Sequence, residues 1–402
     1  MSKKYLVLLI DGMADYPIEE LDGKTVIEFA KTPGIDQLAR KSEIGLAKTV
    51  PDGFPPGSDV ANMSVLGYDP AKYYTGRSPF EALSMGVELE EGDISLRCNL
   101  VTLKGEGDYA NKTMWDHSAG EISTGEAKII IEDCEKQLGS DRFEFYPGVS
   151  YRHLLVWKDG NKEIKLTPPH DILEKKIKEY LPNGSESDSL LELMEKSNQI
   201  LAEHPVNLKR KEEGELEANS IWFWGEGVKP SLSSFSEKYG VKGSVISAVD
   251  LIKGLGFAAG LKSIDVEGAT GRIDTNFKGK VEAAIESLHA GDDFIFLHVE
   301  AADEAGHQGD LATKIKAVET VDELIVQHII EEMKEFDDFS LMILPDHYTP
   351  VSIRTHVGNP VPFMIYRNQF TEEKEQVFSE KTAEKSALNF AEGYKLLDYF
   401  IR

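Results

Sequence analysis

The chain has 402 residues, of which 41% are hydrophobic and 28% charged; this is the composition of a folded globular protein, and the length predicts two domains. The formal net charge is −26, and so acidic a surface repels the phosphates of nucleic acids and anionic lipids, which argues against both as partners. A phosphorylated metabolite would be repelled as well unless metal ions or arginines supplied a local positive site.

The first predicted element is a buried strand at residues 5–10, YLVLLI. Two lysines precede this run as in a secretory signal, but Asp11 ends it before it reaches the length of a secretory core. No apolar run in the sequence approaches the roughly 20 residues that a membrane span needs. Cys98 and Cys134 are too few for a disulfide framework, so we expect reduced thiols. These features predict a cytoplasmic protein without a membrane partner.

A turn and a short helix are predicted next, in the segment PDGFPPGSDVANMSVLGYDP at 51–70. The Pro-Pro-Gly turn places Ser58 at the cap position of a helix that ends before Gly67. Serine is a preferred N-cap residue, and that role alone would explain its presence. A helix N-terminus is also a ready anion site, where a serine beside a metal ion could lose its proton and become a nucleophile. Composition favours the cap but does not decide between the two.

Residues 76–215 differ from the rest of the chain in their pattern of predicted strands and helices. They contain the strand-like segments ISLRCNLVTL and SYRHLLVWK and helix-like segments at 125–139 and 189–202. A charged stretch, NLKRKEEGELEAN, leads out of this region. We therefore expect a smaller α/β domain at 76–215, inserted into a discontinuous domain formed by 1–75 and 216–402. The chain would cross twice between these domains, as in a hinge.

The apolar runs of the C-terminal half are continuous rather than alternating. Continuous runs are typical of strands buried on both faces, as in a parallel sheet covered by helices. Helical patterns separate them, the clearest being an apolar stripe from Leu311 to Phe336. This alternation predicts an α/β fold with a mostly parallel sheet and helices on both faces. The runs are SIWFWG at 220–225, GSVISA at 243–248, FIFLHV at 294–299, SLMIL at 340–344 and PFMIY at 362–366.

Acids and histidines follow three of the predicted strands. Ligands of open α/β sheets bind outside the carboxyl ends of the strands, where residues distant in sequence converge. Carboxylates mixed with imidazoles suit divalent transition metals, and two adjacent ions can clamp the oxygens of a phosphoryl transfer. Each acid–histidine pair alone is more often a cap or a surface feature, but three at strand ends favour a metal site. The candidate ligands are Asp11, Asp303, His307, Asp346, His347 and His356.

Longer blocks of sequence carry a family resemblance. In order, the chain contains DGMAD, PPGSDVANMSVLGYDP, GRSPFEALSMGV, DHSAGEIST, GVSYRHLLVW, TPPHDI, GATGRIDTNFKGK, HVEAADEAGHQGD and DHYTPVSIRTHVGNPVPF. Together these blocks resemble the cofactor-independent phosphoglycerate mutases in their shorter archaeal-type form, a branch of the alkaline phosphatase superfamily. The resemblance covers nearly the whole chain, so it is more specific than any single motif.

The resemblance implies an alkaline-phosphatase-like fold and a phosphotransferase with two divalent metal ions. Manganese is the usual metal of the family, with magnesium, cobalt or zinc in some members. Ser58 would be the nucleophile that becomes phosphoserine. The reaction would interconvert 3-phosphoglycerate and 2-phosphoglycerate through that intermediate, without 2,3-bisphosphoglycerate. The implied ligands are Asp11, Ser58, Asp346 and His347 for one ion, and Asp303, His307 and His356 for the other.

Substrate-binding residues are expected mainly in the inserted domain. Holding glycerate while it reorients requires donors that grip a carboxylate and exclude water, and arginine's planar fork suits this. Asp116 or His117 could transfer protons to and from the glycerate hydroxyls. An ordinary strand arginine or a buried structural histidine would explain some of these residues equally well. The predicted substrate residues are Arg97, Asn99, Arg152, His153 and Lys253, with His170 and Asp171 as further candidates.

Two other classes of function stay open on the sequence. The same serine could pass phosphate to homoserine, as proposed for a branch of similar bacterial proteins, to water, or to another sugar phosphate. No Walker A motif GxxxxGK[ST] occurs, so a kinase of this kind would bind ATP differently. A non-catalytic, metal-stabilised binding protein, in which Ser58 only caps a helix, is the other class.

Overall fold

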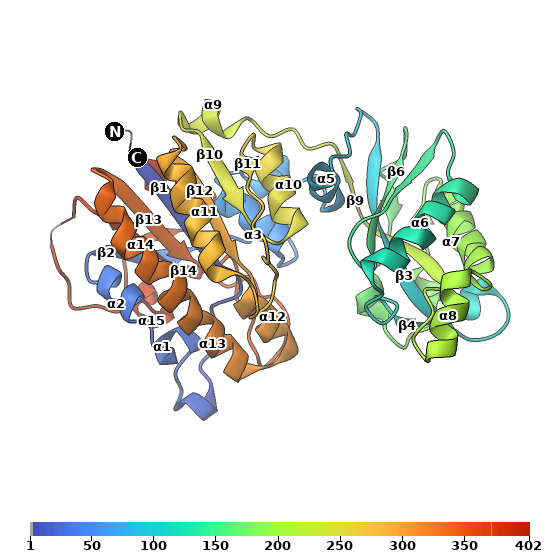
Figure 1. Ribbon diagram of the computed structural model, residues 1–402, viewed down its shortest axis with the longest axis horizontal. Helices are drawn as coiled ribbons and strands as arrows, with labels where there is room; N and C mark the ends of the chain where they lie inside the picture. The colour runs from blue at the N-terminus through green and yellow to red at the C-terminus, as the bar shows by residue number, and fades with distance from the viewer. Residues whose placement is uncertain (1–2, 371) are drawn as a thin grey trace. The chain divides into compact units, whose positions relative to one another are not determined.

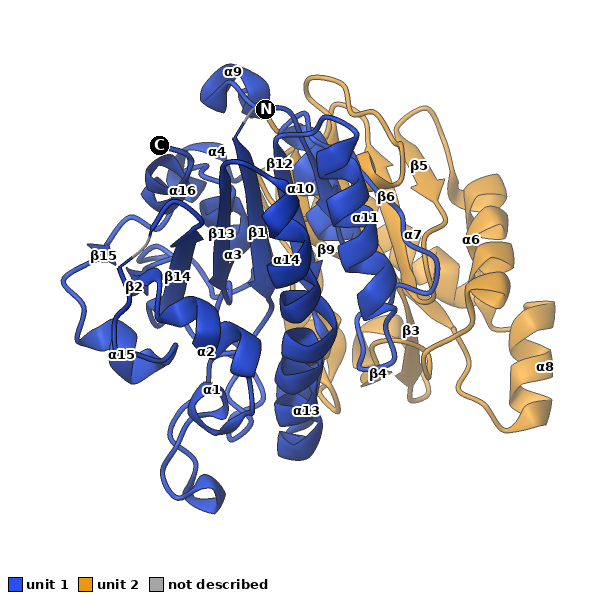
Figure 2. Ribbon diagram, turned by 60° about the vertical axis from the view of Figure 1, so that its left-hand side comes forward, with its two compact units in different colours: residues 1–74, 231–402 blue, residues 75–230 orange. Residues whose placement is uncertain are grey.

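The computed structural model describes residues 3–370 and 372–402. The chain forms two compact units, shown in different colours in Figure 2. Unit 1 comprises residues 1–74 and 231–402, and unit 2 comprises residues 75–230. The chain therefore passes twice between the units, which makes unit 2 an insertion into unit 1.

Within the described residues, unit 1 has an eight-stranded sheet (Figure 1). All neighbouring strands pair in parallel except β14, which is antiparallel to both of its neighbours. This confirms the predicted mostly parallel sheet. In spatial order the strands are β11 (Lys262–Ser263), β10 (Gly243–Ile246), β12 (Phe294–Val299), β1 (Lys4–Ile10), β13 (Phe339–Leu344), β14 (Val361–Arg367), β2 (Ser42–Ala47) and β15 (Asn389–Phe390).

Helices cover both faces of this sheet (Figure 1). One layer contains α2 (Pro33–Ala39), α11 (Phe277–His289), α13 (Leu311–Val321) and α14 (Gln327–Glu332); the other contains α3 (Ser58–Val65), α10 (Asp250–Ala258) and α16 (Lys395–Ile401). The central strands β1, β12 and β13 are buried along their whole length, as their continuous apolar runs predict. The remaining helices of unit 1 are α1 (Val26–Phe29), α4 (Pro70–Tyr73), α9 (Phe235–Tyr239), α12 (Ala301–Gln308) and α15 (Glu380–Glu384).

The predicted stripe from Leu311 to Phe336 is helical but not uniformly so. A π-helical turn at Asp322–Val326 joins α13 to α14. The first residue of this turn, Asp322, contacts α2. The buried Asp322 carboxylate accepts hydrogen bonds from the backbone N–H groups of Gly34 and Ile35 at the start of α2. The π-helical turn therefore lies where this helix ties the first turn of α2 to itself.

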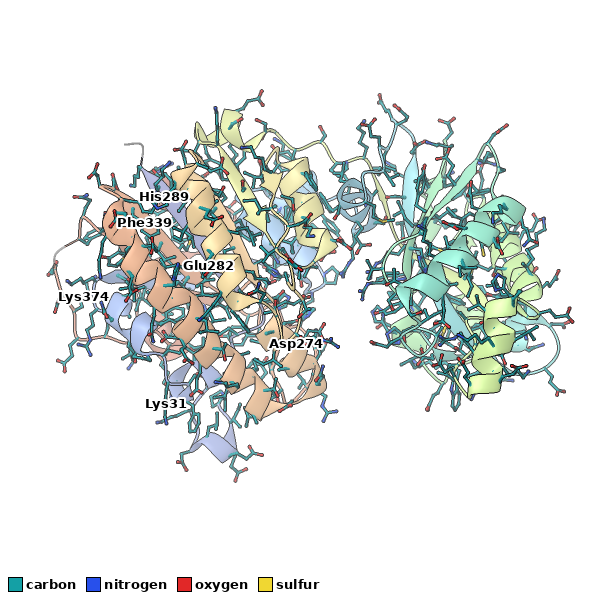
Figure 3. The ribbon with its side chains drawn as sticks, viewed as in Figure 1. Lys31, Asp274, Glu282, His289, Phe339 and Lys374 are labelled. Atoms are coloured by element: carbon teal, nitrogen blue, oxygen red, sulfur yellow. The ribbon has the colours of Figure 1, made fainter. Side chains whose placement is uncertain are left out.

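Aromatic rings pack at the amino end of β13. Phe339 stacks on Phe336 with ring centroids 5.8 Å apart, and Phe336 stacks on His289 at 4.8 Å. Figure 3 labels His289 and Phe339 in this cluster, and also the exposed side chains of Lys31, Glu282 and Asp274, of which Lys31 and Asp274 lie away from it. Among the described residues, no helix combines the length and the apolar character that crossing a bilayer requires.

Unit 2 is built on an antiparallel sheet around β3 (Ile94–Lys104). Its core lies between the sheet and the helices α6 (Thr124–Leu138) and α7 (Ser187–Leu201), and α8 (Pro205–Glu213) packs beside α6 (Figure 2). Leu96, Cys98 and Leu100 of β3 belong to this core, so the alternate residues Arg97 and Asn99 lie on the opposite face. The other elements are α5 (Ser78–Ser84), β4 (Thr113–Asp116), β5 (Phe143–Tyr146), β6 (Arg152–Trp157), β7 (Ile164–Lys165), β8 (Asn183–Gly184) and β9 (Ser220–Val228).

The run SIWFWG belongs to unit 2, which corrects the expected boundary at 215/216. It lies in β9, which pairs antiparallel with β3, and unit 2 continues to residue 230. The run is continuous because both faces are covered: Ile221 and Phe223 lie opposite the core residues Leu100 and Cys98 of β3, while the Trp224 indole lies opposite Arg97 and packs against its guanidinium. A run without alternation is therefore not specific to a parallel strand.

Candidate active site

Three neighbouring parallel strands of unit 1 bring the predicted metal ligands together. Strands β12, β1 and β13 lie side by side, so their carboxyl ends meet at one edge of the sheet. Asp11 directly follows β1, Asp346 and His347 follow β13, and Asp303 lies in the first turn of α12 after β12. All four side chains are buried.

Two groups of ligand atoms form among the described residues, and His347 belongs to both. One group is Asp11, Asp346 and His347, and the other is Asp303, His347 and His356; within each, the ligand atoms lie within 4.8 Å of one another. His347 Nε2 is 3.3 Å from Asp346 Oδ2 and 3.7 Å from Asp11 Oδ1. His356 Nε2 is 3.4 Å from Asp303 Oδ1. Carboxylates and imidazoles at these separations suit a divalent metal ion in each group.

His307 joins the second group through its ring nitrogen. Its Nε2 lies 2.8 Å from His356 Nε2 and 3.3 Å from Asp303 Oδ2. Burial alone would raise the pKa of Asp303, but the hydrogen bonds from His307 and His356 keep that pKa well below its ordinary value. Asp303 is therefore an ionised carboxylate among imidazoles, which is a suitable set of metal ligands.

Asp11 supplies a direct test of whether the residues fit a cation. No hydrogen-bond donor among the described residues contacts its buried Oδ1 atom. Burial raises the pKa of Asp11 well above its ordinary value, and the charges of Asp346 and Asp303 raise it further. A buried, unsatisfied carboxylate oxygen beside two other carboxylates is costly without a positive charge. The site therefore fits a bound divalent cation.

Ser58 is the first residue of α3, and Gly57 occupies the N-cap position. In the described chain the Ser58 side chain makes no capping bond; its Oγ instead lies 3.1 Å from His347 Nε2. Asn62 Nδ2, one turn later on α3, donates to the Ser58 carbonyl oxygen and to Asp346 Oδ2, both at 2.8 Å. The start of α3 is thus fixed against the ligand groups, with the serine hydroxyl facing them.

A second polar cluster lies in unit 2, on the sheet face opposite the core. Arg97 pairs with the Glu81 carboxylate at 2.8 Å, and Arg77 pairs with the same carboxylate at 3.1 Å. The Arg97 guanidinium also lies 4.7 Å from the ring centroid of Trp224. Trp224 Nε1 donates to Asn99 Oδ1 at 3.0 Å. Two arginines and an amide are therefore held on one surface of the sheet.

Other predicted residues of unit 2 lie next to this cluster. Asn99 Nδ2 donates to the carbonyl oxygen of His117, whose ring is 6.1 Å from that of His170. The His170 ring in turn contacts Trp224 at 5.1 Å. Arg152 lies directly opposite Asn99 in the pairing of β3 with β6, so the two side chains lie on the same face of the sheet. Arg97, Asn99, His117 and Arg152 are thus neighbours.

Asp116 is held as a carboxylate beside His117. Its Oδ1 atom accepts hydrogen bonds from the backbone N–H groups of Ser118 and Gly120 and from the Ser118 hydroxyl. Burial would raise the pKa of Asp116, but these hydrogen bonds lower it below its ordinary value. An ionised Asp116 suits a proton acceptor better than a proton donor.

Comparison with known proteins identifies the family. The family model for 2,3-bisphosphoglycerate-independent phosphoglycerate mutase matches residues 39–207. A protein of that name from Methanosarcina barkeri is 52% identical over 402 residues, covering 99% of each chain. The chain belongs to the family of 2,3-bisphosphoglycerate-independent phosphoglycerate mutases.

Two solved structures share the fold of this phosphoglycerate mutase family member. A protein from Pyrococcus horikoshii is 29% identical and superposes with a TM-score of 0.82, over 100% of this chain and 97% of that chain. The cofactor-independent phosphoglycerate mutase from Thermoplasma acidophilum is 24% identical, with a TM-score of 0.66 over 100% of this chain and 99% of that chain. The second likeness supports the fold.

Two predicted substrate residues of this family member lie away from the arginine cluster of unit 2. His153 is opposite Cys98 in the strand register, so it faces the core of unit 2 and not the arginine cluster. It is buried, its Nδ1 accepts a hydrogen bond from the Gly148 N–H, and burial lowers its pKa to about 3. Lys253 lies on α10 of unit 1 and pairs with Asp265 at 2.6 Å.

Several side chains that contact the ligand groups of this mutase family member carry no sequence pattern of their own. His298 Nε2 lies 3.0 Å from Asp11 Oδ2, and Thr349 contacts both Asp303 and His347. Gly12 has a φ of +61°, and a Cβ there would lie 2.7 Å from the Asp303 Cα atom. The sequence could have pointed to these residues only through their position, because each lies in one of the family-like sequence blocks that also contain the predicted ligands.

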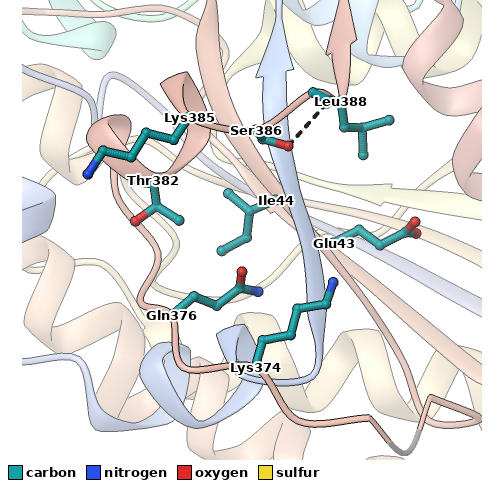
Figure 4. A pocket seen from close by; sticks show the side chains of 9 residues that line it. Glu43, Ile44, Lys374, Gln376, Thr382, Lys385, Ser386 and Leu388 are labelled. Carbon is teal, nitrogen blue, oxygen red and sulfur yellow. Dashed lines mark hydrogen bonds between the residues drawn. The ribbon is translucent and has the colours of Figure 1, made fainter.

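A cavity of about 430 Å³ lies at another part of unit 1 (Figure 4). It is formed by β2, α15 and the segments beside them, and none of the predicted site residues of this mutase family member lines it. Figure 4 shows the Lys374 and Lys385 side chains extending to different sides of it. Its lining residues are Glu43, Ile44, Lys374, Gln376, Thr382, Lys385, Ser386, Ala387 and Leu388.

Proposed function

We propose that this protein interconverts 3-phosphoglycerate and 2-phosphoglycerate in the cytoplasm, through a phosphoserine at Ser58 and without 2,3-bisphosphoglycerate. The observation that carries the proposal is the position of Ser58, whose Oγ is 3.1 Å from the histidine nitrogen common to both ligand groups. A serine hydroxyl at such a place can be activated as a nucleophile. Membership of the mutase family supports the choice of phosphoglycerate as substrate.

Two divalent ions are proposed, with manganese as the metal, because mixed carboxylate and imidazole ligands suit it. When bound, such ions neutralise charge on the phosphoryl group and lower the pKa of a coordinated hydroxyl. They would also offset the repulsion between a phosphorylated substrate and a protein of net charge −26. The proposed ligands are Asp11, Ser58, Asp346 and His347 for one ion, and Asp303, His307 and His356 for the other.

The chain's own residues prepare Ser58 for the transfer. Ser58 Oγ loses its proton and bonds to phosphorus while the bond from phosphorus to the 3-oxygen of glycerate breaks, and that oxygen takes up a proton. In the reverse transfer the 2-hydroxyl of glycerate loses its proton and bonds to phosphorus, the bond from phosphorus to Ser58 Oγ breaks, and Ser58 Oγ takes up a proton. Asn62 keeps the start of α3 in place during both transfers through its bonds to Ser58 and Asp346.

The arginine cluster of unit 2 is proposed to bind the glycerate. Arg97 and Arg152 would pair with its carboxylate, and Asn99 would hydrogen-bond to a hydroxyl. Asp116, held ionised, would accept the proton that the attacking glycerate hydroxyl loses, with His117 beside it as the partner for proton return. Roles for His153 and Lys253 in binding stay predictions without support from their contacts.

The test is an assay of manganese-loaded protein on 3-phosphoglycerate, with 2-phosphoglycerate formation followed by phosphorus NMR and no bisphosphoglycerate present. We expect turnover that stops on chelation, and acid quenching should trap phosphate on Ser58. Ser58→Ala should lose turnover by at least about a thousandfold. Ser64→Ala is the matched control because it removes a buried hydroxyl from the same helix, and it should retain activity. Absence of conversion by metal-loaded wild type would reject the proposal.

A further inference from the structure

Thr349 lies between the two ligand groups and is fully buried. Its hydroxyl hydrogen-bonds to Asp303 Oδ1, and the same oxygen is 3.3 Å from His347 Nδ1. Asp303 belongs to one ligand group only, whereas His347 belongs to both. One hydroxyl therefore connects a carboxylate of the second group to the histidine that the groups share.

The number of protons available decides which groups donate and which accept in the hydrogen bonds of Thr349. A hydroxyl donates one hydrogen bond, and an ionised carboxylate can only accept, so the Thr349 proton points to Asp303. The Thr349 oxygen can then only accept from His347, which places the ring proton of His347 on Nδ1. The lone pair of Nε2 is thereby directed to the side where Ser58, Asp11 and Asp346 lie.

Three segments hold Thr349 in this position. The Lys314 ammonium of α13 donates to the Thr349 carbonyl oxygen at 2.8 Å. A Cβ at Gly12 would lie 2.6 Å from the Thr349 hydroxyl oxygen, and a Cβ at Gly306 would lie 2.9 Å from its methyl carbon. The absence of side chains at both glycines lets the segment after β1 and helix α12 close directly on Thr349.

We propose that Thr349 is a positioning residue that sets the proton of His347 and the direction of the Asp303 carboxylate, and so tunes both metal sites together. The proposal rests on the metal ligands of the proposed function but not on its substrate. Residues that orient metal ligands in this way typically contribute 10–100-fold to metal affinity. Both sites should therefore weaken when the hydroxyl is removed.

The experiment is a manganese titration of metal-stripped full-length protein without substrate, with free Mn²⁺ followed by electron paramagnetic resonance. Thr349→Val keeps the shape and removes the hydroxyl, and we expect its affinity for Mn²⁺ to fall by about tenfold or more. Thr349→Ser keeps the hydroxyl and should bind within about threefold of wild type. Thr320→Val is the matched control, since it removes a buried hydroxyl whose partner, among the described residues, is the Lys316 carbonyl of its own helix.

Three results would overturn the proposal: wild-type affinity in Thr349→Val, a serine variant as weak as the valine variant, or an equal loss in Thr320→Val. If Thr349→Val does not fold, Thr349→Ala compared with Thr349→Ser makes the same contrast of no hydroxyl against hydroxyl. Failure of mutase turnover with an intact difference in Mn²⁺ affinity would reject the proposed reaction and leave the role of Thr349 standing.

Discussion

At the scale of single residues, Asp11 is oriented by a chain of hydrogen bonds that begins at a backbone amide. The Val249 N–H donates to the Ser247 hydroxyl, which lies 3.0 Å from His298 Nδ1. Because the Ser247 oxygen accepts from Val249, its proton is available for Nδ1, and the ring proton of His298 then sits on Nε2. That nitrogen donates to Asp11 Oδ2 at 3.0 Å. A serine thus fixes the tautomer of the histidine that holds a proposed ligand.

Removing that serine hydroxyl should weaken the metal site without dismantling it. We expect Ser247→Ala to raise the manganese concentration needed for half-maximal activity by about tenfold, because Asp11 is no longer held in one orientation. Activity should return at saturating manganese. Ser247→Thr keeps the hydroxyl and should resemble wild type, whereas an unchanged manganese requirement in the alanine variant would contradict this role.

The contrast between residues that could and could not be predicted follows from their chemistry. Asp303 and His347 are visible in sequence because carboxylate and imidazole beside a strand end suggest metal binding in themselves. Ser247 and Thr349 are not visible, because a hydroxyl acquires its role from the partner that the fold places against it. Ser58 was ambiguous for the same reason, and its contact with His347 is what separates it from an ordinary cap.

At the scale of elements, α5 in unit 2 holds two arginines through one buried acid. Glu81 pairs with Arg77 of its own helix start and with Arg97 of β3. Glu81→Gln keeps the shape but removes the charge, so the two guanidinium groups lose their common anchor. We expect the KM for phosphoglycerate to rise about tenfold with a smaller change in kcat. Glu144→Gln, which alters a more exposed acid of the same unit paired with Lys158, is the control.

A loss of thermal stability in Glu81→Gln with KM unchanged would mean that the acid serves folding alone. Arg97 makes this distinction necessary, because it is buried and burial lowers its pKa to about 10. A buried cation left without its counter-charge destabilises the fold whatever its role in binding. Comparing the change in KM with the change in thermal stability therefore distinguishes a binding role of Glu81 from a folding role.

Helix α15 carries a buried acid whose titration should be measurable. Glu380 accepts hydrogen bonds from the Asp15 N–H and the Thr25 hydroxyl, but burial raises its pKa from 4.5 to about 7 despite these bonds. A raised folded-state pKa means that the folded protein binds the proton more tightly, so its stabilising contribution is complete below pH 4.5 and is lost as pH rises through 7.

The expected size of this effect is about 3 kcal/mol between pH 4.5 and pH 7. The Gln side chain in Glu380→Gln cannot ionise. The free energy of unfolding of this variant should therefore increase relative to that of wild type as the pH rises over this range. Urea unfolding of both proteins at several pH values measures the difference. A difference that does not change with pH would show that Glu380 has an ordinary pKa in the folded protein.

The elements themselves were predictable to different degrees. The runs at 5–10, 294–299 and 340–344 correspond to β1, β12 and β13, because central strands must be apolar on both faces. Strands β11 and β15 were not predicted, since each has two residues and no periodicity of its own. The placement of SIWFWG failed because pairing between β3 and β9 joins segments far apart in the chain, which local pattern does not reveal.

At the scale of the whole molecule, the two units separate the proposed tasks. Both ligand groups lie in unit 1, and the arginine cluster lies in unit 2. The chain joins them at 74/75 and 230/231, and unit 2 has a hydrophobic core of its own, so we expect the units to respond to ligands separately. A metal ion that binds folded unit 1 should stabilise that unit by mass action, whereas unit 2 gains nothing directly.

Scanning calorimetry can test this separation. At a free manganese concentration 100 times the dissociation constant of each site, we expect unit 1 to gain about 2.7 kcal/mol per bound ion and its transition to move upward by several degrees. The transition of unit 2 should stay in place, and Asp303→Ala should reduce the shift because it deletes a carboxylate of the second ligand group and leaves the first group intact. The assignment of transitions can be made with a unit 2 core variant such as Leu155→Ala, which should lower only the unit 2 midpoint. If manganese moved the unit 2 transition alone, the metal could not be bound at the strand ends of unit 1, and equal movement of both would mean that the two units unfold as one.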